Sequence, residues 1–251
     1  MRILLISDIH ANLEGLEACL DASPSCDLVV NLGDVVGYGA SPNEVIDKVR
    51  ILGDTIVRGN HDKACAGESE LEYFNPVAAL AVLWTRTTLT TPNLHWLREL
   101  PIGPVRVEKV SEVQFVHGSP IDEDDYVITL ADALPAIIQS AVPITFFGHP
   151  HVQGGFKING KDAATLRPAY QTSDEVEKFE LRLDANTRYL LNPGSVGQPR
   201  DGDWRAAFAV FDTEARVLTY YRVPYNIKGA QKRIRDAELP ERLATRLKEG
   251  K

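Results

Sequence analysis

Three short apolar runs, each ending in polar residues, constrain the fold of this chain most strongly. They cover residues 2–8 (RILLISD), 27–34 (DLVVNLGD) and 55–60 (TIVRGN). Continuous apolar runs of this length are typical of strands that are buried on both faces. Between the runs, Asn12 and Ser41 offer helix N-caps, and apolar residues follow each of them at helical spacing. This β-α-β-α-β alternation predicts an α/β fold with parallel strands and right-handed crossovers.

Beyond residue 60 the pattern predicts more helices and a second half rich in strands. Helical spacing covers about 75–100, 130–140 and the charged stretch 226–251. Strand-like runs occupy 113–117, 144–148, 178–183, 188–192, 206–211 and 217–224. Residues 159–177 are polar and predict a loop, and Asp184-Ala185-Asn186-Thr187 is typical of a hairpin turn. No linker divides the chain, so we expect one domain over 1–251, with a helical insertion at about 62–100 and a C-terminal helical segment at about 226–251.

Charge and cysteine content exclude several classes of protein. The formal net charge of −8 argues against an extended nucleic-acid surface. The three cysteines, Cys19, Cys26 and Cys65, are odd in number and lack CxxC spacing, which favours reduced thiols in a cytosolic protein. The apolar run that follows Met1 is too short for a signal peptide or a membrane span. We therefore expect a soluble, cytoplasmic protein without a membrane partner.

Five of the six histidines stand in short polar groups, and only His95 stands alone. The groups are Asp8-Ile9-His10, Asn60-His61-Asp62, His117-Gly118 and His149-Pro150-His151. Each follows a predicted strand, where open α/β sheets place their chemistry. Mixed imidazole and carboxylate ligands without thiolates indicate Mn, Fe, Zn, Ni or Co. Two ions that share a carboxylate need about four protein ligands each. The candidate ligands are Asp8, His10, Asp34, Asn60, His117, His149 and His151.

Taken in order, these motifs resemble those of the calcineurin-like metallophosphoesterase superfamily. The motifs are D8-x-H10, G33-D34, G59-N60-H61-D62, H117-G118 and G148-H149-x-H151, and the similarity runs from residue 3 to 151. The segment 192–200 (NPGSVGQPR) is similar to a later motif of the small prokaryotic phosphodiesterase branch. The resemblance implies a four-layer α-β-β-α sandwich with two mixed β-sheets and the metals at one strand edge.

The resemblance also implies a role for each residue that matches a motif. It places Asp8, His10 and His151 on one divalent ion and Asn60, His117 and His149 on a second, with Asp34 bridging both. A hydroxide between the ions would attack phosphorus in line, His61 would serve as general acid for the leaving oxygen, and Asp62 would orient His61. Manganese is the expected metal, with Fe, Ni, Zn or Co as alternatives. Two divalent ions and two carboxylates leave a charge of about +2 to hold a phosphate.

One departure from the family's motifs bears on the substrate. Phosphatase relatives carry an arginine after the second motif, in the pattern GD-x-x-D/A-R-G, where this chain has Tyr38. A phosphodiester carries one negative charge fewer than a monoester and tolerates that loss better. We therefore expect a phosphodiesterase acting on a small or nucleotide-like ester. The alternatives are a phosphomonoesterase or protein phosphatase, and a non-catalytic binding scaffold on the same fold. The sequence leaves the oligomeric state open.

Three residues outside the metal motifs are candidates for substrate binding, and each has a structural alternative. Arg58 and Arg200 could each bind a phosphate or form a salt bridge. Tyr38 could stack on a nucleobase or be an ordinary loop aromatic.

Overall fold

The structure is a computed structural model that describes residues 1–53, 55–72 and 74–251, and it contains two five-stranded mixed sheets. The first has the order β2-β1-β9-β10-β7, with strands Leu28–Asn31, Arg2–Ile6, Ala206–Asp212, Val217–Val223 and Glu177–Arg182. The second has the order β3-β4-β8-β5-β6, with strands Val113–Phe115, Ile144–Phe146, Arg188–Asn192, Gly154–Asn159 and Asp162–Leu166. The pairs β1–β2, β3–β4 and β4–β8 are parallel, and the other pairs are antiparallel.

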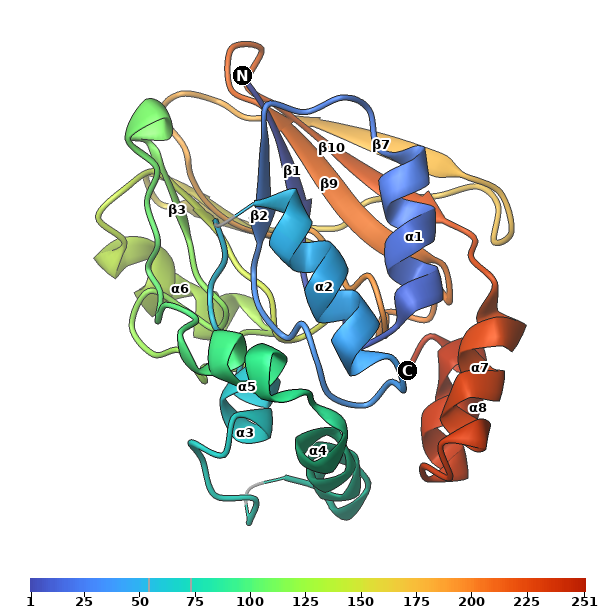
Figure 1. Ribbon diagram of the computed structural model, residues 1–251. Coiled ribbons are helices and arrows are strands. Elements are labelled where there is room, and N and C mark those ends of the chain that lie inside the picture. The colour runs from blue at the N-terminus through green and yellow to red at the C-terminus, as the bar shows by residue number, and fades with distance from the viewer. Residues whose placement is uncertain (54, 73) are drawn as a thin grey trace.

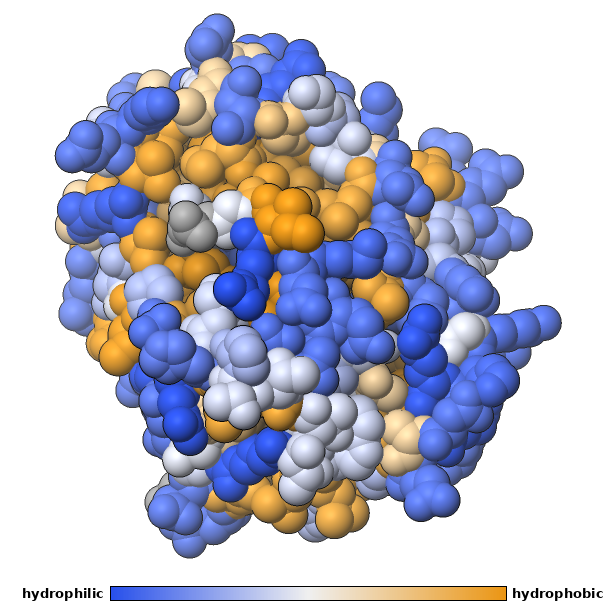
Figure 2. Space-filling model, in the orientation of Figure 1, coloured by the Kyte–Doolittle hydropathy of each residue, from blue (hydrophilic) through white to orange (hydrophobic). Residues whose placement is uncertain are grey.

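Helices cover the outer faces of both sheets (Figure 1). The first sheet carries α1 (Leu13–Ala22), α2 (Pro42–Leu52), α7 (Ile227–Asp236) and α8 (Glu241–Glu249). The second carries α6 (Leu130–Gln139). Below the sheets in Figure 1 lie α3 (Asn60–Cys65), α4 (Pro76–Thr88) and α5 (Thr91–Arg98), and a short 3₁₀ helix covers Glu108–Val110. Figure 2 shows apolar side chains gathered over the upper left of this face and polar ones around α7 and α8.

The alternation of side chains along β1 explains the layers. Leu4 and Ile6 pack against the helices, whereas Ile3 and Leu5 pack between the two sheets, as the period of two in a strand requires. On the far side of the second sheet, Ile137 of α6 belongs to a third apolar cluster. Three apolar interfaces thus separate four layers. The predicted fold, an α-β-β-α sandwich with two mixed sheets, is confirmed.

Three local predictions were wrong. The run at 55–60 forms only a single bridge, between Asn31 and Ile56, because the chain must leave the sheet to start α3 at Asn60. The segment 184–187 is no hairpin, since β7 pairs with β10 in the first sheet and β8 pairs with β4 and β5 in the second. The polar stretch at 159–177 contains β6, which forms a hairpin with β5 around Gly160.

Within the described ranges, the helices are too short or too polar to cross a bilayer.

Candidate metal centre

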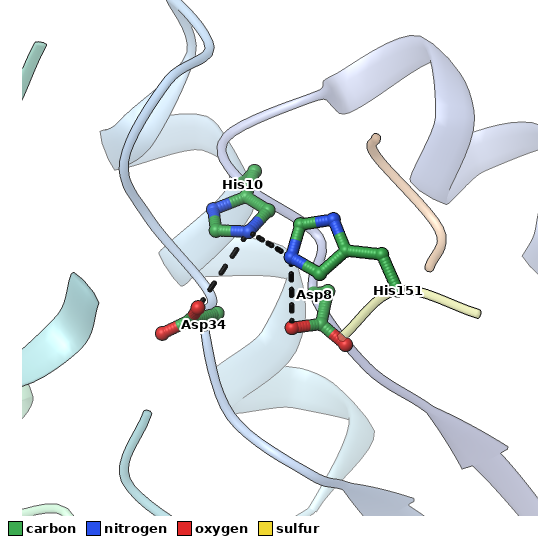
Figure 3. Close-up of side chains that lie close together, drawn as sticks. All are labelled: Asp8, His10, Asp34 and His151. Carbon is green, nitrogen blue, oxygen red and sulfur yellow. Dashed lines mark hydrogen bonds and ion pairs between the residues drawn. The ribbon is translucent and has the colours of Figure 1, made fainter. Parts of the chain in front are cut away.

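The structure brings all seven predicted ligands to one edge of the two sheets. Asp8 follows β1, Asp34 follows β2, His117 follows β3, and the loop after β4 supplies His149 and His151. The charged and imidazole side chains form two groups that share Asp34. One group contains Asp8, His10, Asp34 and His151, and the other contains Asp34, His117 and His149 (Figure 3 shows the first). Within each group the ligand atoms lie within 4.8 Å of one another. Strands distant in sequence thus meet at a single site.

Left-handed backbone is concentrated in these loops. Asp8, His10, Asp34, His149 and His151 have φ angles of 52°, 49°, 54°, 73° and 59°. They are five of the nine non-glycine residues with positive φ in the described part of the chain. This conformation is unfavourable for residues with a β-carbon and persists only where the surrounding structure holds it. The ligand loops therefore carry local strain, which is typical of functional sites.

Backbone carbonyls orient three of the imidazoles. Each Nδ1 lies within hydrogen-bond distance of a carbonyl oxygen: His10 to Val36 (3.1 Å), His117 to Leu32 (2.7 Å) and His151 to Gln198 (2.6 Å). An Nδ1–H that donates to a carbonyl leaves the lone pair of Nε2 free for a metal. The Nε2 atoms face carboxylates: His10 and His117 lie 3.6 and 3.5 Å from Asp34, and His151 lies 3.3 Å from Asp8. Ligand tautomer and direction are therefore set by the scaffold.

Asp34 carries the observation that best tests whether a metal fits. Its Oδ1 accepts the backbone N–H of His61 at 2.8 Å. Its Oδ2 is buried and has no hydrogen-bond partner among the described residues. A buried carboxylate oxygen without a partner is strongly unfavourable. That oxygen lies between His10 and His117, so a cation held by either group would satisfy it. The donor set fits a pair of divalent ions that share Asp34.

Burial and the neighbouring charges shift the pKa values of the four imidazoles in different directions. Burial lowers the pKa of His149 to about 3 and lowers the pKa values of His10 and His151, so these imidazoles are neutral and available as ligands. Burial acts in the same direction on His117, but the charge of Asp34 outweighs it and raises its pKa to about 10. His117 in turn holds the pKa of Asp34 well below its usual range, although burial opposes this. A metal at Asp34 would therefore displace a proton from His117.

Asn60 and His149 complete the second group. Asn60 begins α3, and its Oδ1 lies 3.2 Å from Nε2 of His117. The rings of His149 and His117 lie 4.9 Å apart, centroid to centroid. The backbone N–H of His149 lies 3.1 Å from a carboxylate oxygen of Asp8, which ties the two groups together. Gly59 precedes α3 and lies against Asp34, because a β-carbon at Gly59 would be 2.1 Å from Oδ1 of Asp34.

The segment 192–200 holds the ligand loops in place. The Ser195 hydroxyl and the Gly197 N–H both donate to the Asp8 carbonyl, at 2.7 and 3.0 Å. A β-carbon at Gly197 would lie 1.8 Å from the Ile9 carbonyl oxygen, so only glycine fits there. The Arg200 N–H donates to the His151 carbonyl at 3.1 Å. The motif supports the metal ligands through its backbone and through the Ser195 hydroxyl.

His61 lies beside the ligands but belongs to neither group. Its ring lies 4.4 Å from that of Tyr38 and 5.0 Å from that of Phe74, centroid to centroid, and burial lowers its pKa to about 4. Its Nδ1 has no hydrogen-bond partner among the described residues. Asp62 contacts the loops instead of this ring: its carboxylate accepts the N–H groups of Gly59 (3.1 Å) and Val36 (3.2 Å). Any effect of Asp62 on His61 therefore acts through the backbone.

A cleft of about 460 Å³ opens in front of both groups. It is lined by Asp34, Tyr38, Asn60, His61, Lys63, Ser69, Glu70, Phe74, Asn75, Asp124, Tyr126, His149, His151 and Arg200. Two of the three substrate candidates, Tyr38 and Arg200, are in this lining. Arg58 is not, because it forms 2.9 Å ion pairs with Glu68 and Glu123, which is the salt-bridge alternative.

Sequence reasoning missed several residues that line the cleft. Lys63 follows the third motif but carries no ligand chemistry of its own, and it pairs with Glu123 and Asp124. Phe74 and Tyr126 lie in irregular segments between helices or strands, where no periodicity marks them. The only local signal was position: Phe74 directly precedes the N-cap of α4, and Tyr126 directly follows an acidic run.

Comparison with known proteins identifies the family. The sequence profile of the calcineurin-like phosphoesterase superfamily domain matches residues 1–216. The chain belongs to this superfamily. A crystal structure of a metallophosphoesterase from Sphaerobacter thermophilus has 41% sequence identity and a TM-score of 0.83, and the match covers 100% of this chain and 99% of that one.

Two further relatives span almost the whole chain. An uncharacterized protein of Methanocaldococcus jannaschii is 36% identical over 247 residues, which cover 98% of this chain and 96% of the relative. A hypothetical protein of Pyrococcus horikoshii shares the fold, with a TM-score of 0.78 at 20% identity over 100% of this chain and 98% of that one. The expected membership of the calcineurin-like phosphoesterase superfamily is confirmed. With the buried ligand groups, it supports a metal-dependent phosphoester hydrolase with a dinuclear site.

Proposed function

We propose that this protein is a phosphodiesterase that hydrolyses a small or nucleotide-like phosphodiester with the help of two divalent ions, manganese first among them. The proposal rests on one observation above all. A cleft of about 460 Å³ opens onto two ligand groups that share Asp34. That volume is within the usual range for small-molecule sites. The Oδ2 atom of Asp34 has no hydrogen-bond partner among the described residues. The family supplies the reaction class, phosphoester hydrolysis.

Different residues of the chain would bind each of the two ions. Asp8, His10 and His151 would hold one ion, Asn60, His117 and His149 the other, and Asp34 would bind both. When bound, the ions would supply positive charge for the phosphoryl oxygens and acidify the water that attacks phosphorus. The buried backbone around Asp8 and Asp34 keeps these ligands in place before the substrate arrives.

His61 is the proposed general acid. Its backbone N–H is bonded to Asp34, and its side chain lines the cleft between Tyr38 and Phe74. A bound phosphoryl anion favours the protonated imidazole, which can then give its proton to the leaving oxygen. Because the ring carries no hydrogen bond to a carboxylate, its proton is not committed elsewhere.

The preference for a diester follows from Tyr38. It occupies the position where phosphatase relatives have an arginine, and it packs 4.7 Å from the ring of His10, centroid to centroid. A phosphomonoesterase is the second candidate function, since the Arg200 guanidinium lines the same cleft and could grip a dianionic phosphate.

Paired substrates separate these functions. With saturating Mn²⁺, we expect a higher kcat/KM for bis-p-nitrophenyl phosphate than for p-nitrophenyl phosphate. A tenfold preference for the monoester would move the assignment to a phosphomonoesterase. Two bound ions without turnover of either ester would favour a non-catalytic scaffold.

The proposal also includes a cytoplasmic location and a small-molecule substrate. The acidic net charge supports a small-molecule substrate rather than an extended nucleic acid, and the three free cysteines suit a cytoplasmic protein.

A further inference from the structure

The backbone of His151 is held in an unfavourable conformation by a neighbouring segment. Its φ angle of 59° is left-handed, which costs free energy in a residue with a β-carbon. The Gln198 carbonyl lies 2.6 Å from Nδ1 of the ring, and the Arg200 N–H donates to the His151 carbonyl at 3.1 Å. The position of this metal ligand therefore depends on where the segment around residue 200 lies.

Asp201 adds a further hydrogen bond between the same two parts of the chain. Its Oδ2 accepts the backbone N–H of Gln153 at 3.1 Å, two residues beyond His151. The backbone from His151 to Gln153 is thus attached to Arg200 and Asp201 at two points, one on the carbonyl of His151 and one on the N–H of Gln153. This pair of contacts restrains the left-handed turn between them.

Arg222 of β10 fixes the carboxylate of Asp201. Its Nη2 donates to the same Oδ2, and its Nη1 donates to the Arg205 carbonyl at 3.3 Å. The side chain of Arg222 is 3% exposed and that of Asp201 is 16% exposed, so this charge-assisted bond is shielded from water. Arg222 belongs to the first sheet, whereas Gln153 directly precedes β5 of the second. The Asp201 carboxylate therefore joins the two sheets beside a ligand loop.

Asp201 can act on the metal centre only through this backbone. It belongs to neither ligand group of the described chain, and it does not line the cleft. Its loss should not release β5, because the side-chain amide of Gln153 donates separately to the carbonyls of Pro193 (2.9 Å) and Tyr221 (3.1 Å). The effect of a substitution at Asp201 should be confined to the residues just before Gln153.

We infer that Asp201 is a positioning residue of the metal centre: fixed by Arg222, its carboxylate sets the backbone at His151 so that this imidazole faces its metal. The inference rests on the proposed function, which assigns His151 to one of two ions. Nε2 of His151 lies 3.3 Å from the carboxylate of Asp8 in the same ligand group. His149 is restrained separately, because its own N–H lies 3.1 Å from a carboxylate oxygen of Asp8. Asp201 should therefore affect one ion and not the other.

Metal binding by Asp201→Ala tests the inference. Equilibrium dialysis of the full chain against graded Mn²⁺, followed by elemental analysis, measures the affinity of each ion. Loss of an outer partner of a metal ligand typically lowers metal affinity about 10–100-fold. We expect a loss of that size for one ion and none for the other. Asp201→Asn keeps an oxygen that can accept the Gln153 N–H but loses the ion pair with Arg222, so it should recover part of the affinity.

A double variant connects the effect to His151. His151→Ala removes the ligand that Asp201 is inferred to position. Adding Asp201→Ala to this variant should cause no further loss of metal affinity, because two residues that act through one contact are not additive. A further loss of the same size as in the wild-type background would overturn the inference, since Asp201 would then act by another route.

Asp203 provides a matched control. Its side chain is 19% exposed and pairs with the buried Arg205 at 2.6 Å, much as Asp201 pairs with Arg222. Over the described ranges, its side-chain hydrogen bonds come from Arg205 and none comes from residues 149–153. Asp203→Ala and Asp201→Ala should both lower the melting temperature, because each deprives a buried arginine of a partner. Only Asp201→Ala should weaken an ion.

Three other results would overturn the inference. They are unchanged affinities in Asp201→Ala, an equal weakening of both ions, and an equal loss in Asp203→Ala, since Asp201 would then serve only the stability of the fold. If Asp201→Ala does not fold, the same measurement on Asp201→Asn decides. A wild-type protein that binds fewer than two ions would count against the proposed function and not against the role of Asp201.

Discussion

The two sides of the cleft are built in different ways. On the ligand side, Asp8 and Asp34 are fully buried, sit in left-handed backbone and are held by hydrogen bonds from neighbouring loops. On the helical side, Lys63 of α3 is half-buried and is held by side-chain ion pairs with Glu123 and Asp124. The ligand side can therefore tolerate few changes. The helical side can change without disturbing the sheets, which makes it the place where substrate preference can vary.

The largest effect should come from Asp34→Ala. Asp34 belongs to both ligand groups, and its unsatisfied Oδ2 lies between His10 and His117. We expect loss of both ions and of all turnover. Elemental analysis of the purified variant after dialysis against Mn²⁺ measures the first, and diester hydrolysis measures the second.

Asp124→Ala is the matched control for this change. Asp124 also lines the cleft, but it is exposed and pairs with Lys63. The Asp124→Ala variant should still bind two ions per chain. If Asp34→Ala still binds two ions, the shared-carboxylate arrangement is wrong.

His61→Ala should separate chemistry from metal binding. The ring of His61 lies outside both ligand groups, so the variant should keep its metals. Loss of a general acid typically lowers the rate by about 10²–10⁴-fold. Elemental analysis and kcat for bis-p-nitrophenyl phosphate check the two halves of the prediction. A variant that loses both ions would make His61 a ligand and would move it to the ligand side of the comparison.

The ligand side could be predicted from the sequence because its signals are local. Asp8 and His10 stand two residues apart directly after an apolar run, and a polar residue at the end of a buried strand has few other roles. The four-layer arrangement came from the family resemblance, since periodicity alone predicts only the β/α alternation and a second half rich in strands. The sheets to which β7 and β8 belong depend on pairing partners that are distant in sequence. The turn residues at 184–187 therefore predicted a hairpin that does not form.

The helical side could not be predicted, for a physical reason. Arg246 reaches Tyr38 only because α8 packs back over the apolar cluster beside α1, more than two hundred residues away in sequence. The sequence around Arg246 is that of an ordinary charged amphipathic helix. Its contact with the ring of Tyr38 is a property of tertiary packing. The β5–β6 hairpin was missed for a different reason. Asn159-Gly160 is typical of a hairpin turn, but β6 is exposed and polar and has no apolar run that would predict a strand.

Arg222 and Arg246 should differ in what they contribute to stability, because Arg222 pairs with a side-chain carboxylate and Arg246 contacts a ring and a main-chain oxygen. Arg222→Met removes a buried cation from Asp201, whose carboxylate would keep the N–H of Gln153 as a donor. We expect the free energy of unfolding to fall by about 3 kcal/mol. Arg246→Met removes a contact with the ring of Tyr38 and a hydrogen bond to the main-chain oxygen of Lys251, together worth about 1–2 kcal/mol. Urea unfolding of both variants checks the difference. Equal losses would mean that Arg246 stabilises the fold, and the contrast between the two kinds of arginine would disappear.

Of the effects on turnover, the smallest should come from Tyr38→Arg, which places beside the ligand loops the guanidinium that phosphatase relatives carry. A dianionic monoester would gain a charge-assisted hydrogen bond, worth about 1.5–3 kcal/mol, or roughly ten- to hundredfold in relative kcat/KM. Arg200 and Arg246 already lie against residue 38, so repulsion among three cations should keep the gain near the lower limit. The measurement is kcat/KM for p-nitrophenyl and bis-p-nitrophenyl phosphate, with Tyr38→Phe as the control for loss of the hydroxyl. Combining Tyr38→Arg with Arg246→Ala should relieve the repulsion and increase the shift toward the monoester. No shift in either variant would show that the residue at position 38 does not set the preference, and the diester assignment would then lose its main support.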